Sequence, residues 1–427
     1  MFHKQTIKDI SLENKTVLLR VDYNVPIVDG QVADDYRIKK SLVTIKYLLD
    51  HNCKIVICSH LGRPNGRVDP KFSLFPVAKR LKEVLDHHVE FVPECIGDQV
   101  LRAVSRLTQR QILLLENLRF HPEEKANDDG FAKQLASLGE VFVQDAFGVI
   151  HREQASIVGV PKYLPSVAGF LVEQEVNDIT KAIQSPKRPL MTVIGGAKIV
   201  DKIDVLSRFI KIADVVAIGG AMANTFLAAE GLDVATSSYD KQDIHIARNI
   251  LAEARKEEKR RNFAFILPFD GVVAEGLERN GKTRIVDWSA HVISDIESYP
   301  KRPPKESAHL QPKELILDVG PFSAALIAGV VQLAGTVIWN GTLGVTETES
   351  LIGGVGPFSH GTDILVQALT GEFGHKPYTV VGGGDTVGYI EGRKMVKMFD
   401  LVSTGGGASL ELMAGHKLPG LEALRNI

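Results

Sequence analysis

Five short apolar runs in the second half of the chain end on glycine or on Asn-Gly. They occupy residues 190–194, 215–218, 337–339, 378–381 and 401–404. Apolar runs of this length are typical of strands buried on both faces of a parallel sheet. A glycine directly after such a strand lets backbone N–H groups approach a ligand, usually a phosphate. Because the carboxyl ends of parallel strands meet at one edge, we expect these five turns to face one nucleotide.

The first half alternates strand-like and helical patterns. The strand-like runs cover 17–20, 54–58, 111–115 and 140–143, and residues 38–49 carry apolar side chains at three- and four-residue spacing. This alternation predicts βαβ units and a parallel sheet. A long helix is expected over 169–183, ended by the two prolines of 185–189.

A chain of 427 residues exceeds one ordinary core, so two domains are expected. We predict an α/β protein with two doubly wound, Rossmann-like parallel-sheet domains joined by a helical hinge. The segment 301–305 contains two prolines and is predicted to be a loop.

Composition narrows the functional class. The formal charge of −2 argues against a dedicated nucleic-acid binder. The three cysteines, Cys53, Cys58 and Cys95, form no C-x-x-C pair. Their spacing therefore argues against a zinc or disulfide framework and favours buried free thiols in a reducing compartment. The first ten residues lack a signal-peptide pattern and no long apolar run occurs, so we expect a cytoplasmic protein without membrane contact.

Basic side chains follow the strands of the first half. A single arginine or histidine in such a place is usually a solvated surface group, but repeated placement after strands indicates a common site. Guanidinium groups match carboxylate and phosphate oxygens in bidentate geometry, so a small, multiply anionic ligand is expected. The residues concerned are His60, Arg63, Arg119, His151 and Arg152.

Three cations stand where helices are predicted to begin. Arg37 follows a pair of aspartates that can cap the helix over 38–49, and Lys198 and Lys202 are expected on one face of a helix. Positive charge in a first turn opposes the helix dipole by roughly 0.3–1 kcal/mol. These positions make sense when an anion arrives, and the two lysines suit a phosphoryl group in transfer. The apolar face of the second helix is Ile199, Ile203, Leu206 and Ile210.

Asp385 follows the glycine run 382–384 and precedes Thr386. A carboxylate beside a phosphate-binding loop is unfavourable unless a cation lies between them. Mg²⁺ is held by one or two carboxylates together with substrate phosphates, so Asp385 fits a magnesium ligand. Capping of a helix N-terminus is the alternative interpretation, and one residue can serve both roles.

Seven stretches resemble the phosphoglycerate kinase family in order and spacing over essentially the whole length. They are RVDYNVP (20–26), SHLGRP (59–64), LLENLRF (114–120), DAFGVIHR (145–152), GGAKIVDKI (195–203), VVGGGDT (380–386) and STGGGASLE (403–411). The resemblance implies reversible phosphoryl transfer from 1,3-bisphosphoglycerate to Mg·ADP, giving 3-phosphoglycerate and ATP in glycolysis. It also implies a monomer whose domains, 1–172 with 412–427 and 173–411, close by hinge bending for direct in-line transfer.

The resemblance also assigns residues, all numbered as in this chain. For phosphoglycerate it implies Asp22, Asn24, Arg37, His60, Arg63, Arg119 and Arg152. For the nucleotide it implies Gly196, Lys198, Lys202, Gly219, Asn340, Glu347, Gly383, Gly384, Asp385 and Thr386, with Asp385 holding Mg²⁺. Arg37, the two lysines and the amides of Gly405 and Gly406 are expected at the transferred group.

The chain departs from the family pattern mainly around the expected adenine and ribose pocket. The differences are Ala221, Ser238, Thr342 and a longer, glycine-rich segment over 348–360, with Gln154 a further one elsewhere. These differences are expected to affect nucleotide selectivity more than the phosphoryl-transfer chemistry.

Two other classes compete with this interpretation. A dehydrogenase on Rossmann domains needs G-x-G-x-x-G at the start of a helix, and no glycine cluster here has that spacing. A non-catalytic relative acting as a scaffold or nucleic-acid binder is the remaining alternative, and the altered adenine region motivates it.

Overall fold

The computed structural model describes residues 2–288, 309–348 and 355–427. The predicted loop over 301–305 and part of the segment 348–360 lie outside these residues. The chain divides into two compact units. Unit 1 comprises Met1–Thr180, Gly407–Leu412 and His416–Ile427, and unit 2 comprises Lys181–Gly406 and Met413–Gly415.

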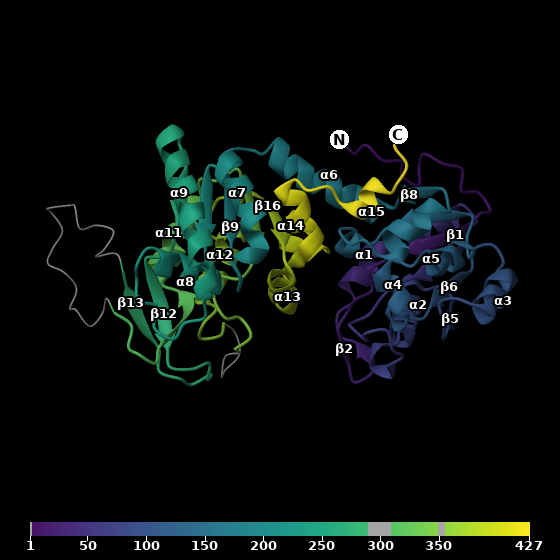
Figure 1. Cartoon of the computed structure of the whole chain (residues 1–427), viewed down its shortest axis with the longest axis horizontal. Coiled ribbons are helices and arrows are strands. Elements are labelled where there is room, and N and C mark those ends of the chain that lie inside the picture. Colours follow the sequence, from purple (N-terminus) through teal and green to yellow (C-terminus); the bar gives the residue numbers. More distant parts are fainter. Residues whose placement is uncertain (1, 289–308, 349–354) are drawn as a thin grey trace. The chain divides into compact units, whose positions relative to one another are not determined.

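Unit 1 is built on a six-stranded sheet of order β5-β6-β4-β1-β7-β8 (Figure 1). All neighbouring strands are parallel, and the four strands predicted in the first half all belong to this sheet. The strands are β1 (Thr16–Arg20), β4 (Lys54–Cys58), β5 (Val89–Val92), β6 (Ile112–Leu115), β7 (Val141–Gln144) and β8 (Ser166–Ala168). A short antiparallel hairpin, β2 (Ile27–Val28) and β3 (Gln31–Val32), follows β1.

Helices cover both faces of this sheet. Alternate residues of β1 point to opposite faces, since Val17 and Leu19 pack with α1 and α2 whereas Leu18 packs with α3 and α5. The prediction of a doubly wound domain is therefore confirmed for unit 1. The helices are α1 (Tyr36–Asp50), α2 (Phe75–Leu85), α3 (Asp98–Arg106), α4 (Pro122–Ala126), α5 (Asp129–Ala136) and α15 (Pro419–Glu422).

Unit 2 contains a second six-stranded parallel sheet, of order β11-β10-β9-β15-β16-β17. All five glycine-ended runs are strands of this one sheet, as predicted. The strands are β9 (Leu190–Ile194), β10 (Val215–Ile218), β11 (Ala264–Ile266), β15 (Thr336–Asn340), β16 (Tyr378–Gly382) and β17 (Leu401–Val402). A smaller antiparallel sheet joins β12 (Asp270–Ala274), β13 (Arg284–Asp287) and β14 (Leu315–Val319).

The helices of unit 2 alternate with these strands, so the α/β class with two parallel sheets is confirmed. They are α7 (Ile203–Ile212), α8 (Gly220–Ala229), α9 (Ile244–Arg260), α11 (Pro321–Val331), α12 (His360–Thr370) and α13 (Gly384–Gly392). The residues of α14 (Gly406–Ala414) are divided between the two units. None of the helices in the described part of the chain is long and apolar enough to span a bilayer.

Helix α6 (Phe170–Gln184) runs from unit 1 into unit 2, close to the predicted range of 169–183. Its start is fixed by Asp145, whose Oδ1 accepts hydrogen bonds from the backbone amides of Leu171 (2.9 Å) and Val172 (3.3 Å). The two prolines that follow α6 cannot continue a helix, which explains where it ends.

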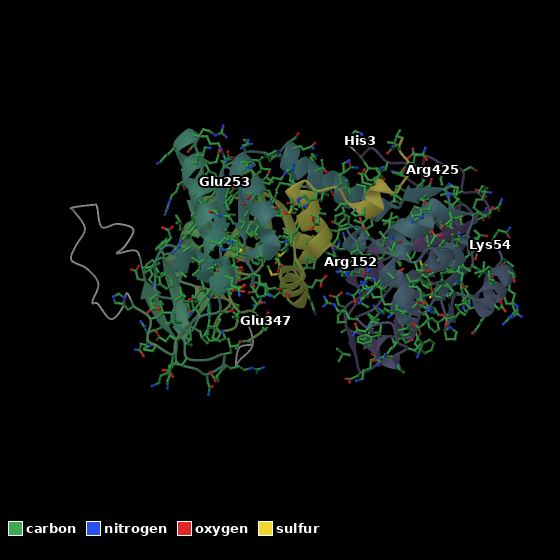
Figure 2. The ribbon with its side chains drawn as sticks, viewed as in Figure 1. His3, Lys54, Arg152, Glu253, Glu347 and Arg425 are labelled. Atoms are coloured by element: carbon green, nitrogen blue, oxygen red, sulfur yellow. The ribbon has the colours of Figure 1, made fainter. Side chains whose placement is uncertain are left out.

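The C-terminal end of the chain packs beside the N-terminal end within unit 1. The Gln5 amide donates to the Arg425 carbonyl at 2.8 Å, and the Ile427 amide donates to the His3 carbonyl at 3.2 Å (Figure 2 labels His3 and Arg425). Lys4 is buried and its Nζ donates to the carbonyl of Leu424 at 3.2 Å. The last residues therefore complete the unit that the first residues begin.

Candidate functional site

Asp22 is the centre of a charged cluster at the carboxyl end of β1. Its carboxylate is 5% exposed and accepts a hydrogen bond from Nη1 of Arg37, which lies in the first turn of α1 as predicted. The Nε2 of His60 lies 3.9 Å from Asp22 Oδ1, and the Asn24 amide donates to the same oxygen at 3.1 Å. Arg37 and His60, predicted from separate segments, thus meet at one carboxylate, which also accepts from the backbone amide of Asn24.

Charge and burial act in opposite directions on this cluster. Burial by itself raises the pKa of Asp22, but the charges of Arg37 and Arg20 and the hydrogen bond from the Asn24 amide outweigh it and lower the pKa to about 2. Burial lowers the pKa of His60 well below its ordinary value, so the imidazole is neutral at physiological pH. The cluster therefore holds an ionised carboxylate and a neutral histidine.

Arg119 is the most informative cation of unit 1. It is 5% exposed and lies in the 3₁₀ turn Leu118–Phe120 after β6, where its Nη1 donates to the Gly62 carbonyl at 2.8 Å. Its buried Nε and Nη2 find no hydrogen-bond partner among the described residues. Burial and the neighbouring charges of Arg20 and Arg152 lower the pKa of Arg119 to about 10, so it stays charged. Such unsatisfied donors are expensive and are commonly explained by a missing ligand.

The other predicted residues of this site lie on the same group of loops. Asn24 is exposed and its Oδ1 accepts from the Gly62 amide at 2.8 Å. Arg63 is exposed on that same loop, and Arg152 (labelled in Figure 2) is partly buried, close enough to Arg119 to affect its pKa. His151 is partly buried as well, and its Nδ1 lacks a partner in the described part of the chain.

Arg20 is a residue of this cluster that the sequence interpretation missed. It is fully buried, and it donates from Nε to Ser156 Oγ at 2.8 Å while its Nη2 lies 3.3 Å from His60 Nδ1. Ser156 in turn donates to the buried carboxylate of Glu124 at 2.6 Å. The sequence signal that could have identified Arg20 is its position, because it is an arginine at the end of the otherwise apolar strand β1.

In unit 2 the glycine turns touch one another through their backbones. Gly220 has φ +64° at the start of α8, and a Cβ there would lie 2.6 Å from the amide nitrogen of Gly196. Gly341 has φ +101°, and a Cβ there would lie 2.3 Å from the Gly195 carbonyl carbon. Any larger residue at these two positions would force the turns apart. Gly219, a predicted nucleotide contact, is the N-cap of α8 and donates to the Ile194 carbonyl at 3.0 Å.

Lys202 supplies the buried positive charge of this arrangement. Its Nζ donates to the Gly195 carbonyl at 2.5 Å, to the Asn340 carbonyl at 3.1 Å and to Asn340 Oδ1 at 2.8 Å. Burial lowers the pKa of Lys202 to about 8, against the charge of Asp385, which raises it. The buried Nδ2 of Asn340 has no partner among the described residues.

The prediction that Lys198 and Lys202 share one helix face is wrong. Helix α7 begins only at Ile203, after the 3₁₀ turn Val200–Lys202, so Lys198 stands in the preceding glycine loop and is exposed. The three oxygens around Lys202 turn its side chain inward and keep this segment out of regular helix. The expected apolar face is partly preserved, because Ile199, Leu206 and Ile210 are buried.

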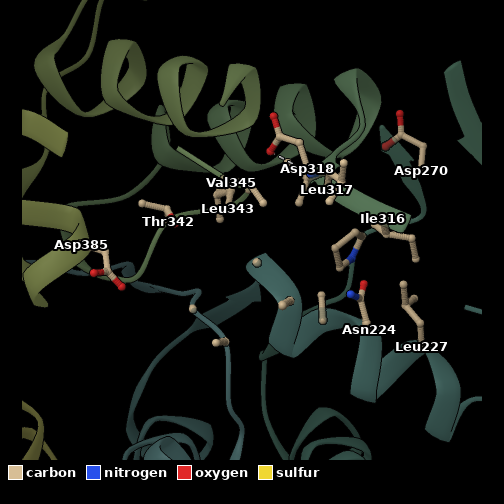
Figure 3. A pocket seen from close by; sticks show the side chains of 18 of the residues that line it. Asn224, Leu227, Asp270, Ile316, Leu317, Asp318, Thr342, Leu343, Val345 and Asp385 are labelled. Atoms are coloured by element: carbon tan, nitrogen blue, oxygen red, sulfur yellow. Dashed lines mark hydrogen bonds between the residues drawn. The ribbon is translucent and has the colours of Figure 1, made fainter. Parts of the chain in front are cut away.

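A cavity of about 150 Å³ lies beside these turns (Figure 3). Its walls come from α8, from β14 and from the loop after β15, and Glu347 and Asp385 lie at its lining. Glu347 is exposed (labelled in Figure 2) and also lines a neighbouring hollow with Gly384 and Asp385. The predicted residues Gly196, Glu347 and Asp385 are therefore brought together at one cavity.

Asn224 on α8 is a polar residue of this cavity that the sequence interpretation missed. It is 1% exposed, and its Nδ2 donates to the Ser238 carbonyl at 3.1 Å, which fixes the orientation of the amide. The Oδ1 is buried and has no partner among the described residues. Figure 3 shows it beside Leu227 and Ile316, at the apolar end of the cavity.

Two buried carboxylic acids also line the cavity (Figure 3). Asp270 accepts from the amides of Phe322 (2.9 Å) and Ser323 (2.8 Å) at the start of α11. Asp318 accepts from the Gly361 amide at 2.9 Å at the start of α12, and burial raises the pKa of Asp318 to about 8. Both therefore anchor helix N-termini.

The alternative that Asp385 caps a helix is wrong, because the N-cap of α13 is Gly383. Asp385 lies in the first turn of α13 and is exposed at the cavity, with Gly384 beside it. Thr386 is buried and its Oγ1 accepts from the Gly341 amide at 2.7 Å. An exposed carboxylate at a phosphate-binding turn has the donor chemistry that Mg²⁺ requires, so the residues present fit this ion.

The last predicted residues, Gly405 and Gly406, stand at the start of α14. The Gly405 amide donates to Ser403 Oγ at 3.1 Å. A Cβ on Gly406 would lie 3.3 Å from the Gly384 amide nitrogen, so these turns lie side by side within unit 2.

The two parallel-sheet units, with charged loops in one and glycine turns in the other beyond the carboxyl ends of the strands, define a protein of the two-unit α/β class that binds ligands at those strand ends. The sequence profile of the family described as phosphoglycerate kinase matches residues 7–416. The chain belongs to the phosphoglycerate kinase family.

Individual relatives and solved structures support the same family assignment. The chain is 41% identical over 421 residues to the phosphoglycerate kinase of Moorella thermoacetica, covering 99% of each chain. It is 42% identical over 427 residues to that of Chloroflexus aurantiacus, again with 99% of each covered. Among solved structures it resembles the phosphoglycerate kinases of Coxiella burnetii (TM-score 0.79, 32% identity) and Pyrococcus horikoshii (TM-score 0.81, 29% identity), with 98% of each chain covered.

Proposed function

We propose that the chain transfers a phosphoryl group between 1,3-bisphosphoglycerate and Mg·ADP, reversibly, giving 3-phosphoglycerate and ATP. The observation that carries the substrate assignment is Arg119, a buried guanidinium with two N–H groups that lack partners in the described part of the chain. A phosphate or carboxylate would satisfy both in bidentate geometry.

Unit 1 is the proposed phosphoglycerate site. Arg119 and Arg152 would hold phosphate oxygens together with Arg63, whose exposed side chain is available on its loop. Asn24 and Asp22 would contact the glycerate portion. Because Asp22 already pairs with Arg37 and His60, the carboxylate orients these groups and holds Arg37 at the point where it would meet the transferred group.

Unit 2 is the proposed nucleotide site. The cavity beside α8 would take the adenosine, with Glu347 at the ribose, and the turns around Gly196, Gly219 and Asn340 would meet the phosphates. Asp385 would hold Mg²⁺, with Gly383, Gly384 and Thr386 shaping its turn. When bound, the ion neutralises charge on the nucleotide phosphates.

The chemistry needs no general base. In the reverse direction the nucleophile is a carboxylate, which is ionised at neutral pH because its pKa lies near 4. The cationic side chains Arg37, Lys198 and Lys202 and the amides of Gly405 and Gly406 would stabilise charge on the transferring group. Positioning and charge neutralisation then account for catalysis.

The two proposed sites belong to different units, so transfer requires that the domains close around the substrates. The proposed domains are 1–172 with 412–427, and 173–411; the compact units change over a few residues away, within α6 and α14, which supports this division. Closure also excludes water, which would otherwise hydrolyse the acyl phosphate. Solution scattering should show a smaller radius of gyration with both substrates than with either alone, and an unchanged radius would contradict closure.

The activity is tested by following ATP formation from ADP and 1,3-bisphosphoglycerate in the purified chain. We expect turnover that depends on Mg²⁺ and is lost on chelation. A folded chain without turnover would instead favour the non-catalytic scaffold. We further propose a cytoplasmic monomer, and a larger mass in solution by light scattering would contradict the monomer.

A further inference from the structure

Three potential metal-binding side chains meet in unit 1, outside the proposed phosphoglycerate site. Glu94 and Cys95 follow β5, and His121 follows the 3₁₀ turn Leu118–Phe120 after β6. One ligand atom of each, a carboxylate oxygen, Sγ and an imidazole nitrogen, lies within 4.8 Å of the other two. Because the donors come from two distant segments, no spacing in the sequence points to them.

The contacts of this cluster are short and polar. His121 Nε2 lies 2.7 Å from Glu94 Oε1, and the Cys95 amide donates to that same oxygen at 2.7 Å. Cys95 is 1% exposed, whereas Glu94 and His121 are only partly buried. The thiol therefore forms the floor of the cluster, and the carboxylate and imidazole form a rim that an ion from solvent can reach.

The distances suit a small tetrahedral ion. Zinc binds sulfur at about 2.3 Å and nitrogen or oxygen at about 2.0–2.2 Å, which places donors roughly 3.3–3.6 Å apart. Opening the His121–Glu94 contact and drawing in Cys95 requires side-chain movements on the order of 1 Å, which the flexible Glu94 can supply. The fourth position would open toward solvent on the side of Glu94 and His121.

Charge favours a divalent ion as well. A thiolate from Cys95, the Glu94 carboxylate and a neutral His121 carry two negative charges, which a dication neutralises. In the free protein Cys95 is a buried free thiol, so its proton must leave before the sulfur can bind a metal. A bound metal displaces that proton and forms the ligand set.

We propose that Glu94, Cys95 and His121 form a binding site for a divalent transition-metal ion of the zinc class. Thiolate and imidazole donors select zinc, cobalt or copper over the hard ion Mg²⁺. The site joins the loop after β5 to the turn that carries Arg119, two residues before His121. A metal bound there would stiffen the support of that arginine.

Cobalt(II) added to the full, metal-stripped chain is the direct probe. Thiolate ligation gives a near-ultraviolet charge-transfer band, and tetrahedral geometry gives strong visible bands, neither of which cobalt at an all-oxygen site produces. We expect both bands at one equivalent of cobalt, their displacement by Zn²⁺, and a higher unfolding midpoint with Zn²⁺.

Variants decide whether these three residues are the ligands. Cys95→Ser should abolish the charge-transfer band, and His121→Gln and Glu94→Gln should each weaken cobalt binding tenfold or more. Cys53→Ser, whose hydroxyl can keep the bond to the Leu12 carbonyl, and His87→Gln are the matched controls and should bind normally.

Three results would overturn the site: no band in the unaltered chain, a band that persists in folded Cys95→Ser, or unchanged affinity in His121→Gln. Because His121 is partly exposed, its variant remains decisive if the cysteine variant fails to fold. Since the site does not involve the nucleotide residues, loss of kinase activity alone would not bear on it.

Discussion

The two proposed sites would attract anions by opposite means. Unit 1 uses long cationic side chains held by buried partners, as when Arg37 pairs with Asp22 and Arg20 bonds Ser156. Unit 2 uses backbone turns so close together that only glycine fits, with one buried ammonium group, Lys202, at their centre. Side chains allow a site to be shaped to one small molecule, whereas backbone amides meet phosphates of any nucleotide.

The two buried cations also differ in whether the protein satisfies them. Lys202 already donates to three oxygens, so it holds the unit together without ligand. Arg119 keeps two buried N–H groups unpaired within the described residues, so it costs stability until an anion arrives. Removing each cation should therefore change stability in opposite directions, and this difference can be tested.

Replacement of Lys202 should have the largest effect. Lys202→Met removes the charge and the hydrogen bonds to the Gly195 carbonyl and to Asn340 Oδ1, whereas the Asn340 carbonyl still accepts from the Gly195 amide. We expect turnover to fall on the order of 10²–10³-fold, with a stability loss of about 1–3 kcal/mol. The matched control is Lys198→Met, which removes an exposed ammonium and should lower turnover without moving the unfolding midpoint. Equal midpoints for both variants would contradict the structural role of Lys202.

Arg37→Ala comes next and tests the cation that Asp22 holds. If Arg37 stabilises charge on the transferred group, kcat should fall about 10²-fold, with a smaller change in KM for 3-phosphoglycerate. Steady-state kinetics in both substrates separates the two effects. A rise in KM alone would make Arg37 a ground-state anchor.

Arg119→Met should weaken phosphoglycerate binding while stabilising the ligand-free chain. Loss of charge-assisted hydrogen bonds worth about 1.5–3 kcal/mol corresponds to a roughly 10–150-fold rise in KM. The unfolding midpoint without ligand should rise, because an unsatisfied buried guanidinium is gone. Arg119→Lys keeps the charge without the planar fork and should show the KM effect only. A lower midpoint for the methionine variant would show that Arg119 is satisfied in the free protein.

Asn224→Leu should alter the choice of base with little change in turnover on ADP. The unpaired Oδ1 can accept from the amino group of adenine but meets an oxygen in guanine or hypoxanthine. We expect the preference for ADP over GDP and IDP, measured as a ratio of kcat/KM, to shrink about tenfold. An unchanged ratio would remove Asn224 from base recognition.

The smallest effects on catalysis are expected from the two buried carboxyl groups that anchor helices, one in each unit. Burial raises the pKa of Asp145 at α6 to about 7 and that of Asp318 at α12 to about 8. The unfolded carboxyl ionises near pH 4, so the stability from each protonated group is complete below about pH 4. This stabilisation is lost as the pH rises through about 7 for Asp145 and through about 8 for Asp318. Denaturant unfolding between pH 5 and 9 should therefore show falling stability, which Asp145→Asn and Asp318→Asn each flatten; an unflattened slope would contradict the raised pKa.

The architecture could be predicted from local sequence patterns, because strand burial and helix periodicity depend on residues that are close together in the sequence. The five glycine-ended strands of unit 2, the strands of unit 1 and helix α6 were all recognisable in this way. The charged loops of unit 1 were predicted for the same reason, since each residue directly follows a strand.

Long-range contacts set the limits of prediction. Lys198 and Lys202 share helical spacing, yet Asn340, which lies far along the chain, draws Lys202 inward and α7 begins later. Arg20, Asn224 and the cluster of Glu94, Cys95 and His121 likewise depend on partners from distant segments. Contacts between distant segments leave no periodic pattern in the sequence, so these residues can be identified only from the structure.

The return of the C-terminal residues to unit 1 has a consequence for biosynthesis. Unit 2 is almost one uninterrupted stretch, Lys181–Gly406, whereas unit 1 combines Met1–Thr180 with Gly407–Leu412 and His416–Ile427. On the ribosome, the half that emerges first is therefore complete only after residues 416–427 have been synthesised, and the half translated second can mature before it. Truncation of the chain before residue 416 would spare the nucleotide half and leave the other half open to proteolysis.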